Sequence, residues 1–229
     1  LYVLNDKEVY GKGLADGVAK IAKEQGLTVL GNDGIDTKAA NFRSLASKIA
    51  AAGADCMFFG GITQNKGVQV FKDVGAANPN VKLYGPDGVA EEAFTNPKKG
   101  GIPAEVGKRT KITVATLGLE EFKKRGNADA EKFFTDFEAE YGTSKPDPYA
   151  IYGYETMALA LDTLKAVGDK ANDRKAVAEQ LVGNTKGRNS VLGTYDIDEN
   201  GDTTLTDYGL YTIENGEPTF SKVIKAEGG

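Results

Sequence analysis

Short runs of hydrophobic residues alternate with amphipathic segments along the first part of the chain. Residues 1–6 read as a buried strand, and a glycine-containing turn at 10–13 leads from this strand into a helix. Further strands are predicted at 27–30, 56–59 and 81–84. Strands that alternate with helices at spacings of about 25 residues are typical of a parallel sheet with right-handed crossovers. The pattern therefore predicts a doubly wound α/β layer.

Each predicted helix between these strands is marked by a stripe of apolar residues. The stripes are Leu14, Val18, Ile21 and Ala22 in the first helix, Phe42, Leu45 and Ile49 in the second, and Val68 and Phe71 in the third. Parallel α/β sheets bind their ligands beyond the carboxyl ends of the strands. We therefore expect residues 6–10, 60–64 and 86–89 to line the functional edge.

The second half of the chain is predicted to be mainly helical at first. Residues 119–141 are strongly charged, with phenylalanines on one side, and read as a surface helix that begins a new unit. A proline-containing hinge at 146–148 leads into a long, largely apolar helix, and another helix is predicted at 171–183. The apolar residues of the long helix are Met157, Leu159, Leu161 and Leu164.

After Ser190 the pattern changes to short strands. They are separated by Asn200-Gly201 and Asn215-Gly216, which are strong hairpin signals. Parallel units followed by helices and then by hairpins imply that the chain leaves its first lobe and later returns to it.

The composition is that of an ordinary globular protein. The chain has 229 residues, of which 40% are hydrophobic, so it can bury a full core. Its 28 Lys and Arg residues against 33 Asp and Glu give a net charge of −5 without a dense basic run, which argues against a nucleic-acid partner. Because the chain opens inside a strand, we expect that the natural protein has further residues before Leu1.

Histidine is absent from the sequence. This excludes Ser-His-Asp and Cys-His catalysis and most zinc sites, and it favours a binding protein over an enzyme. The single cysteine, Cys56, lies in an apolar strand and is expected to be a small buried hydrophobic residue.

Two glycine-rich segments are candidate phosphate sites. The segment Gly11–Gly17 follows a strand, but Asp16 stands where a dinucleotide motif needs its third glycine, and its charge would repel a pyrophosphate. The segment Gly60–Lys66 lacks the spacing of a phosphate loop. Its backbone amides, at the head of the third predicted helix, could still receive a carboxylate.

An acidic segment has the spacing of a calcium loop. Asp196, Asp198, Asn200 and Asp202 stand at alternate positions, and Asp207 stands at the twelfth position in place of glutamate. The flanking residues read as strands, and Asn200-Gly201 explains the turn as a hairpin. We therefore expect no metal.

Three residues at predicted strand ends and at the hinge stand out as candidate ligand contacts. Asp87 closes the fourth strand, where it is either a solvated turn residue or an acceptor for a ligand ammonium. Tyr10 and Tyr149 are either surface aromatics or the walls of a binding site.

Five segments in order resemble a known family. They are Tyr10-Gly11-Lys12-Gly13, Phe58-Phe59-Gly60-Gly61, Gly85-Pro86-Asp87-Gly88-Val89, Pro148-Tyr149 with the helix that follows, and Asp198-Glu199-Asn200-Gly201-Asp202. Together they resemble the branched-chain amino acid-type substrate-binding proteins of ABC transporters, which have the type I periplasmic binding protein fold. In that fold two Rossmann-like α/β lobes are joined by a hinge, and the ligand is trapped between them.

The resemblance implies how the chain is divided. Residues 1–118 would form the second lobe, 119–206 the C-terminal part of the first lobe, and 207–229 a return to the second lobe. About the first third of the family pattern, which forms most of the first lobe, has no counterpart in the chain.

The resemblance also implies roles for single residues. Tyr10 matches a tyrosine that covers the ligand, Asp87 matches the acid that receives its α-ammonium, and Tyr149 matches an aromatic residue that packs on its side chain. Thr63, two places after Gly61, stands where amino-acid-specific members often carry an aromatic residue, which leaves room for other small amino acids, amides or carboxylates. We take Tyr10, Gly61, Thr63, Asp87 and Tyr149 as the candidate ligand-binding residues.

The expected function is that of an extracytoplasmic solute-binding component of an ABC importer, periplasmic or lipid-anchored. Its partner would be the membrane permease, it would need no cofactor, and its signal peptide would have been removed. A ligand-sensing domain of a regulator or receptor with the same fold stays open as an alternative. An α/β enzyme that uses Asp87 and Glu91 is a further alternative.

Overall fold

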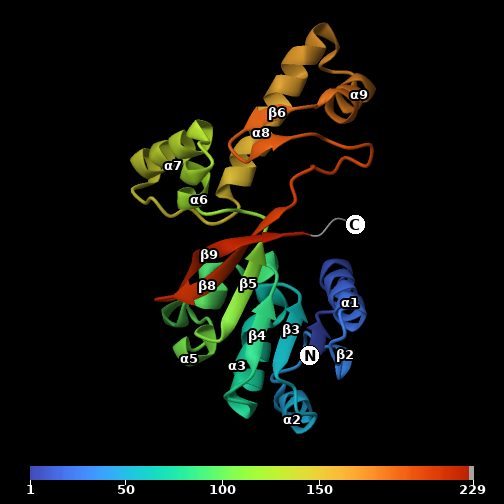
Figure 1. The fold of residues 1–229 in the computed structure, drawn as a ribbon, viewed down its shortest axis with the longest axis vertical. Coiled ribbons are helices and arrows are strands. Elements are labelled where there is room, and N and C mark those ends of the chain that lie inside the picture. Colours follow the sequence, from blue (N-terminus) through green and yellow to red (C-terminus); the bar gives the residue numbers. More distant parts are fainter. Residues whose placement is uncertain (227–229) are drawn as a thin grey trace. The chain divides into compact units, whose positions relative to one another are not determined.

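The computed structural model describes residues 1–226 and divides the chain into two compact units (Figure 1). Unit 1 contains Leu1–Ala115 and Gly209–Lys222, and unit 2 contains Thr116–Tyr208 and the described residues from Val223 onward. The predicted boundaries at 118/119 and 206/207 lie three and two residues from these limits. The assignment of the segments to two lobes of a larger fold stays a prediction.

Unit 1 is built on a seven-stranded sheet with the order β2-β1-β3-β4-β5-β8-β9. The strands are β1 (Tyr2–Asn5), β2 (Gly31–Gly34), β3 (Cys56–Gly60), β4 (Lys82–Gly85), β5 (Thr110–Val114), β8 (Asp207–Glu214) and β9 (Glu217–Lys225). The first five are parallel to one another, and β8 pairs with β5 in the antiparallel sense (Figure 1). The predicted α/β layer is confirmed. The order reverses at β1 and β3, which makes the end of these strands the topological switch point.

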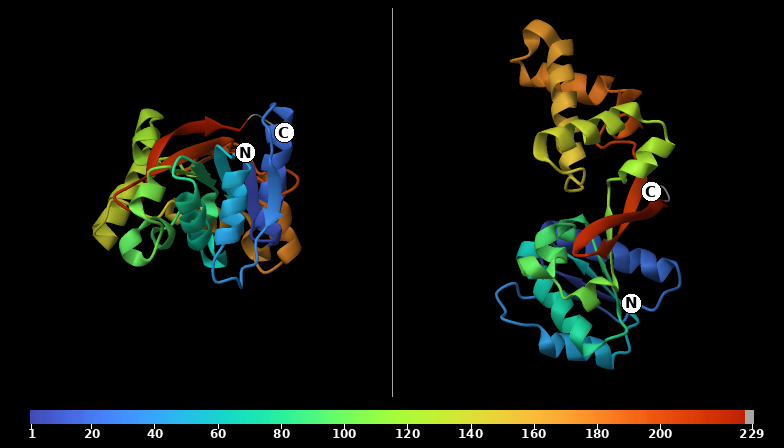
Figure 2. Two further views of the ribbon diagram at one scale, coloured as in Figure 1. Left: turned by 90° about the horizontal axis from the view of Figure 1, so that it is seen from below. Right: turned by 90° about the vertical axis from the view of Figure 1, so that its left-hand side faces the viewer.

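Helices cover both faces of this sheet (Figure 2). Helix α1 (Val9–Glu24) packs on the face that presents Val3, while α2 (Arg43–Ala51) and α3 (Gly67–Ala77) pack on the face that presents Tyr2 and Leu4. Successive strand residues point to opposite faces, so β1, buried throughout, contacts both layers. Short elements complete the unit: η1 (Thr63–Asn65), η2 (Asp87–Val89), α4 (Glu92–Thr95), η3 (Pro97–Lys99) and α5 (Ala104–Gly107).

The second strand was predicted in the wrong place. Leu27 and Leu30 are exposed, and the strand that pairs with β1 is the polar segment Gly31–Gly34 that follows them. It lies at the edge of the sheet, where pairing depends on the backbone. Gly31 leaves room for the ring of Tyr2, whose hydroxyl donates to Asp33 Oδ2 at 2.6 Å. A polar edge strand of this kind has no hydrophobic signature.

The first helix begins earlier and buries a different face than predicted. Tyr10 and Gly11 lie inside α1, and the residue that turns the chain between β1 and α1 is Lys7, with φ +67°. The buried residues of the helix are Gly11, Ala15, Ala19 and Ala22, whereas Leu14 and Ile21 are exposed. Small residues let the helix axis approach the sheet closely: a Cβ added at Gly11 would lie 2.5 Å from the carbonyl oxygen of Gly60.

Two glycines of α1 are expected to respond to substitution with opposite signs. In Gly11→Ala the new methyl group clashes with β3 and with Asp6 Oδ1, 2.2 Å away, so we expect a loss of about 1–3 kcal/mol in the free energy of unfolding. Gly17 has no atom within 4 Å of its would-be Cβ, so Gly17→Ala should gain up to about 1 kcal/mol from helix propensity. Urea denaturation of the two variants measures both. Equal effects would contradict the close packing of α1 on β3.

Unit 2 consists of helices and a small hairpin. Its elements are α6 (Leu119–Lys124), α7 (Ala128–Tyr141), α8 (Ala150–Val167), η4 (Gly168–Lys170), α9 (Arg174–Asn184), β6 (Arg188–Ser190) and β7 (Gly193–Tyr195), of which the last two form an antiparallel pair. The single helix predicted over 119–141 is divided in two. The chain turns at Gly126, with φ +67°, and the Asn127 side chain caps α7 by accepting from the amide of Ala130.

The later helices of unit 2 also differ in detail from the prediction. Helix α9 begins after Asp173, whose carboxylate accepts two backbone amides, and it runs through Gly183. Helix α8 buries Ile151, Glu155 and Thr163, whereas three of its predicted apolar residues, Met157, Leu161 and Leu164, are exposed. None of the helices in the described part of the chain is long and apolar enough to cross a membrane.

Both predicted hairpin turns are present. Asn215 (φ +54°) and Gly216 (φ +86°) connect β8 to β9, and positive φ at both central residues is the requirement of a type I′ turn. At the other turn, Ile197 and Thr203 form an antiparallel bridge, and Gly201 has φ +88°.

Candidate ligand-binding site

The candidate site lies in unit 1, beyond the carboxyl ends of β1, β3 and β4. Asp6 follows β1, Gly61 follows the glycine that ends β3, and Asp87 begins η2 just after β4. The amide of Asp6 donates to the carbonyl oxygen of Gly60 at 3.0 Å, so the ends of β1 and β3 are joined where the strand order reverses. Open α/β sheets bind ligands at this position.

Tyr10 and Asp87 meet at this edge, although 77 residues separate them. The Tyr10 hydroxyl donates to Asp87 Oδ1 at 2.6 Å, and it accepts from the amide of Gly88 at 3.3 Å. Burial, and then the hydrogen bond to Asp87, raise the pKa of the Tyr10 phenol well above its usual value. The phenol therefore stays protonated at neutral pH. It orients the half-buried carboxylate of Asp87.

Thr63 and Gly61 approach the same segment from the β3 side. The Thr63 hydroxyl donates to the carbonyl oxygen of Gly88 at 3.4 Å. A Cβ added at Gly88 would lie 2.8 Å from the carbonyl oxygen of Gly61, so the two backbones are in close contact. The structure thus brings four of the five predicted site residues together within unit 1.

The segment Gly60–Lys66 precedes the third helix, as expected, but it does not run into the helix directly. A 3-10 turn, η1, intervenes, and α3 begins only at Gly67. The residue before α3, Lys66, has a left-handed φ of +68°. The expectation that backbone amides of this segment receive a carboxylate stays a prediction.

Two polar pairs accompany the site. Gln64 Nε2 donates to Glu91 Oε1 at 2.9 Å. Asn65 Nδ2 donates to Oδ2 of Asp6 at 2.8 Å, and Asp6 is only 2% exposed. The sequence placed Asp6 and Gln64 on the functional edge. Asn65 was missed, because one amide side chain just beyond the expected range carries no signal of its own.

Tyr149 belongs to unit 2, where it is the N-cap residue of α8. Its ring lies 5.5 Å from that of Tyr152, measured between centroids, and it is partly exposed. Burial, with a smaller effect of Tyr208, raises the pKa of Tyr152 to about 12. The role of Tyr149 as a ligand contact stays a prediction.

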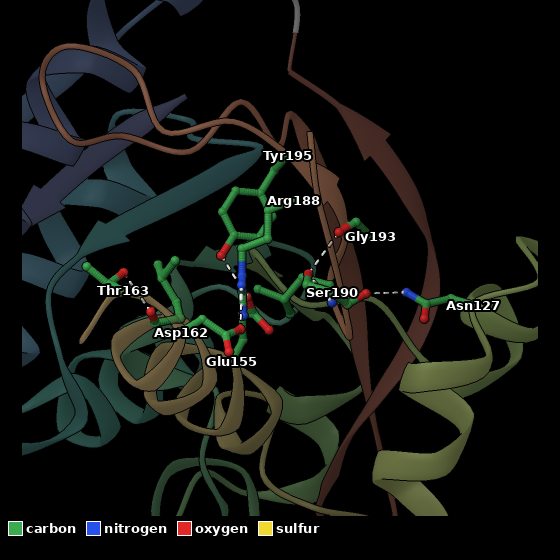
Figure 3. A network of polar contacts seen from close by, with 10 residues as sticks. Asn127, Glu155, Asp162, Thr163, Arg188, Ser190, Gly193 and Tyr195 are labelled. Carbon is green, nitrogen blue, oxygen red and sulfur yellow. Dashed lines mark hydrogen bonds and ion pairs between the residues drawn. The ribbon is translucent and has the colours of Figure 1, made fainter. Parts of the chain in front are cut away.

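Unit 2 also contains a buried charged network that the sequence did not indicate (Figure 3). Oε1 of Glu155 accepts from Arg188 Nε at 2.6 Å and from the Tyr195 hydroxyl at 2.7 Å. Arg188 Nη1 also donates to Asp162 at 2.9 Å. Burial lowers the pKa of Arg188, but its bonds to Glu155 and Asp162 outweigh this effect and raise it overall. The network fastens α8 to the β6–β7 hairpin.

The acidic segment with the spacing of a calcium loop forms an ordinary turn. Oδ1 of Asp198 accepts from the amides of Asn200 and Asp202, both at 2.9 Å. Within residues 1–226, no group of three or more His, Cys, Asp or Glu side chains is arranged to hold a metal ion.

Known proteins are similar to this chain over most of its length. The family model described as "Periplasmic binding protein" matches residues 1–218. The chain belongs to this family. Among curated members, the chain is 27% identical over 215 residues to the Leu/Ile/Val-binding protein homolog 1 of Brucella suis. The match covers 93% of this chain and 53% of that protein, so the chain spans about half the length of this relative.

Solved structures of periplasmic binding proteins confirm the fold. A leucine-binding protein, LivK, from Thermotoga maritima matches with a TM-score of 0.82 at 21% identity, over 98% of this chain and 60% of that one. A solute-binding protein of an ABC transporter from R. palustris, in complex with benzoate, matches with a TM-score of 0.74 at 20% identity, over 99% of this chain and 59% of that one. The family resemblance stated from the sequence is confirmed, and the relatives are described as binding proteins, in agreement with a non-enzymatic role.

Proposed function

We propose that this chain supplies part of the ligand site of an extracytoplasmic solute-binding protein that serves an ABC importer. The ligand would be an amino acid or a related small polar solute. It would be held between two lobes by hinge closure, because contacts made by both lobes favour the closed form. The membrane permease of the importer would be the partner, and the protein would act in the periplasm or anchored to the outer side of the membrane.

The observation that carries this proposal is the pair of Tyr10 and Asp87 at the switch point. A half-buried carboxylate held by a phenol that stays protonated offers a fixed negative charge, and such a charge suits a ligand ammonium. The segment that contains Asp87 is held by two further contacts: the Gly88 amide donates to the Tyr10 hydroxyl, and the Thr63 hydroxyl donates to the Gly88 carbonyl oxygen. Family membership gives independent support, since proteins of this family are binding proteins.

The same charge favours an amino acid over a simple carboxylate. The Brucella relative is named for leucine, isoleucine and valine, and the Thermotoga protein for leucine, whereas the R. palustris protein was solved with benzoate. Benzoate has no ammonium group for Asp87 to receive, and the acidic side chains of Asp6 and Glu91 lie at the same edge. We therefore rank α-amino acids first and place their amides next.

A thermal-shift screen of the complete product of the gene tests the proposal. The panel contains the natural amino acids, their amides, and small carboxylates that include benzoate. A ligand at about 100 times its Kd should stabilise the protein by about 2.7 kcal/mol, which amounts to a shift of several degrees. We expect shifts with amino acids. A shift with carboxylates alone would contradict the role given to Asp87, and a folded protein that responds to nothing would contradict the proposal.

A further inference from the structure

A buried carboxylate lies directly behind the candidate site. Asp6 is 2% exposed, and it has no ion-pair partner among the described residues. Its Oδ1 accepts from the amide of Glu8 at 3.1 Å, and its Oδ2 accepts from Asn65 Nδ2 at 2.8 Å. Burying a carboxyl group is costly unless it is hydrogen-bonded, and here two hydrogen bonds offset part of that cost.

The backbone on both sides is shaped around this carboxylate. A Cβ added at Gly11 would lie 2.2 Å from Asp6 Oδ1, and one added at Gly61 would lie 2.9 Å from Asp6 Oδ2. The carboxylate therefore fills the space between the first turn of α1 and the segment that follows β3. Tyr10 is the neighbour of Gly11, and Thr63 comes two residues after Gly61.

The Asp6–Asn65 hydrogen bond forms a bridge, and each of its two residues is next to a residue with a strained backbone. Lys7, next to Asp6, has φ +67°, and Lys66, next to Asn65, has φ +68°. Residues other than glycine adopt this left-handed conformation only when their surroundings hold them in it, and such residues cluster at functional sites. The Asp6–Asn65 hydrogen bond joins the two strained connections to each other.

We infer that Asp6 is a positioning residue of the candidate site and acts through Asn65. The bridge sets the spacing between the helix that carries Tyr10 and the turn that carries Thr63, and so keeps the Tyr10 hydroxyl on Asp87 and Gly88. The inference that this matters for a ligand rests on the proposed function. The geometric part, that the bridge holds Tyr10 in place, can be tested without any ligand.

The test uses an exchange of the two side chains. In Asn65→Asp a partly buried carboxylate faces the buried carboxylate of Asp6, and the bridge is lost. In the double variant Asp6→Asn with Asn65→Asp, the new amide can accept from Glu8 and donate to the new carboxylate, which rebuilds the bridge with the charge on the other residue. The matched control is Asp6→Asn alone, in which the Asn65 amide can turn over and accept instead.

Two measurements are made on the complete gene product. The first is hydrogen exchange of the Gly88 amide, which donates to Tyr10, with the amide of Leu83 in β4 as the control for global unfolding. We expect Asn65→Asp to speed exchange at Gly88 by about tenfold or more beyond any change at Leu83. The double variant should return the exchange rate of the Gly88 amide to within about threefold of the wild-type rate. An unchanged Gly88 in Asn65→Asp, or a double variant as fast as the single one, would overturn the inference.

The second measurement is a calorimetric titration with L-leucine. We expect Asn65→Asp to raise the Kd by about tenfold or more and the double variant to restore it. Binding by all variants with equal Kd would overturn the functional part of the inference. If the wild type gives no heat with L-leucine, leucine is not its ligand and the titration is made with the amino acid that gives the largest thermal shift, while the exchange at Gly88 decides by itself whether Asp6 positions Tyr10.

Discussion

Replacing Asp87 by alanine is expected to weaken the binding of an α-amino acid by roughly 2–5 kcal/mol, which is about 30- to 5,000-fold in Kd. The variant leaves the ligand ammonium without its counter-charge at the switch point. It also leaves the Tyr10 hydroxyl without the carboxylate to which it donates at 2.6 Å. Isothermal titration of the complete gene product, with the amino acid that gives the largest thermal shift, measures the effect.

The ligand itself supplies the sharper control for Asp87. An analogue that keeps the carboxylate and side chain but lacks the amino group should bind the wild type weakly, and Asp87→Ala should not weaken it further. Asp55→Ala is the matched protein control, since Asp55 is an exposed acid that precedes β3 at the opposite edge of the sheet. If Asp87→Ala weakens both ligands equally, the carboxylate does not pair with the ammonium.

The sheet and its functional edge could be predicted because their signals are local. The hydrophobic runs in β1, β3 and β4 indicate buried parallel strands, and the carboxyl ends of such strands meet at one edge. Tyr10 and Asp87 could therefore be expected near each other without knowledge of any contact. Their hydrogen bond, by contrast, depends on the close approach of α1 to the sheet.

The misplaced elements share a physical cause. The strand β2 is polar because an edge strand needs only backbone pairing, and α1 packs through Gly11 and three alanines because their size allows close approach. Hydrophobic periodicity detects large apolar side chains, so it selected Leu27–Leu30 and the stripe of Leu14 and Ile21 instead. Tertiary packing decided both elements against the local pattern.

The polar contacts could not be predicted from the sequence, for a different reason. Asn65 lies 59 residues from Asp6, and Glu155 lies 33 residues from Arg188. A single charged or amide residue that finds its partner across such a separation leaves no pattern in either segment. In α8 the buried Glu155 even interrupts the apolar sequence, so hydrophobicity assigns the helix the wrong inner face.

Removal of the Glu155 side chain is expected to destabilise unit 2 by about 3–5 kcal/mol. Glu155 is 4% exposed, and in Glu155→Ala the Arg188 guanidinium and the Tyr195 hydroxyl both lose the oxygen to which they donate. Because Arg188 keeps its bond to Asp162, we expect a value near the lower end of this range. Native-state hydrogen exchange of the α8 amides measures the loss within unit 2 alone.

The control for Glu155 comes from the neighbouring helix. Glu179 in α9 forms an exposed ion pair with Lys175 at 3.8 Å, so Glu179→Ala makes the same chemical change in a helix without burial and should cost no more than about 1 kcal/mol. Glu155→Gln keeps an acceptor for Arg188 or Tyr195 and should fall between the two alanine variants. A Glu155→Ala protein whose α8 amides exchange no faster than those of Glu179→Ala would show that the network does not fasten the hairpin to α8. The expected order of the three variants follows from burial, because a guanidinium that loses one of its two partners away from water cannot recover the lost interaction from solvent.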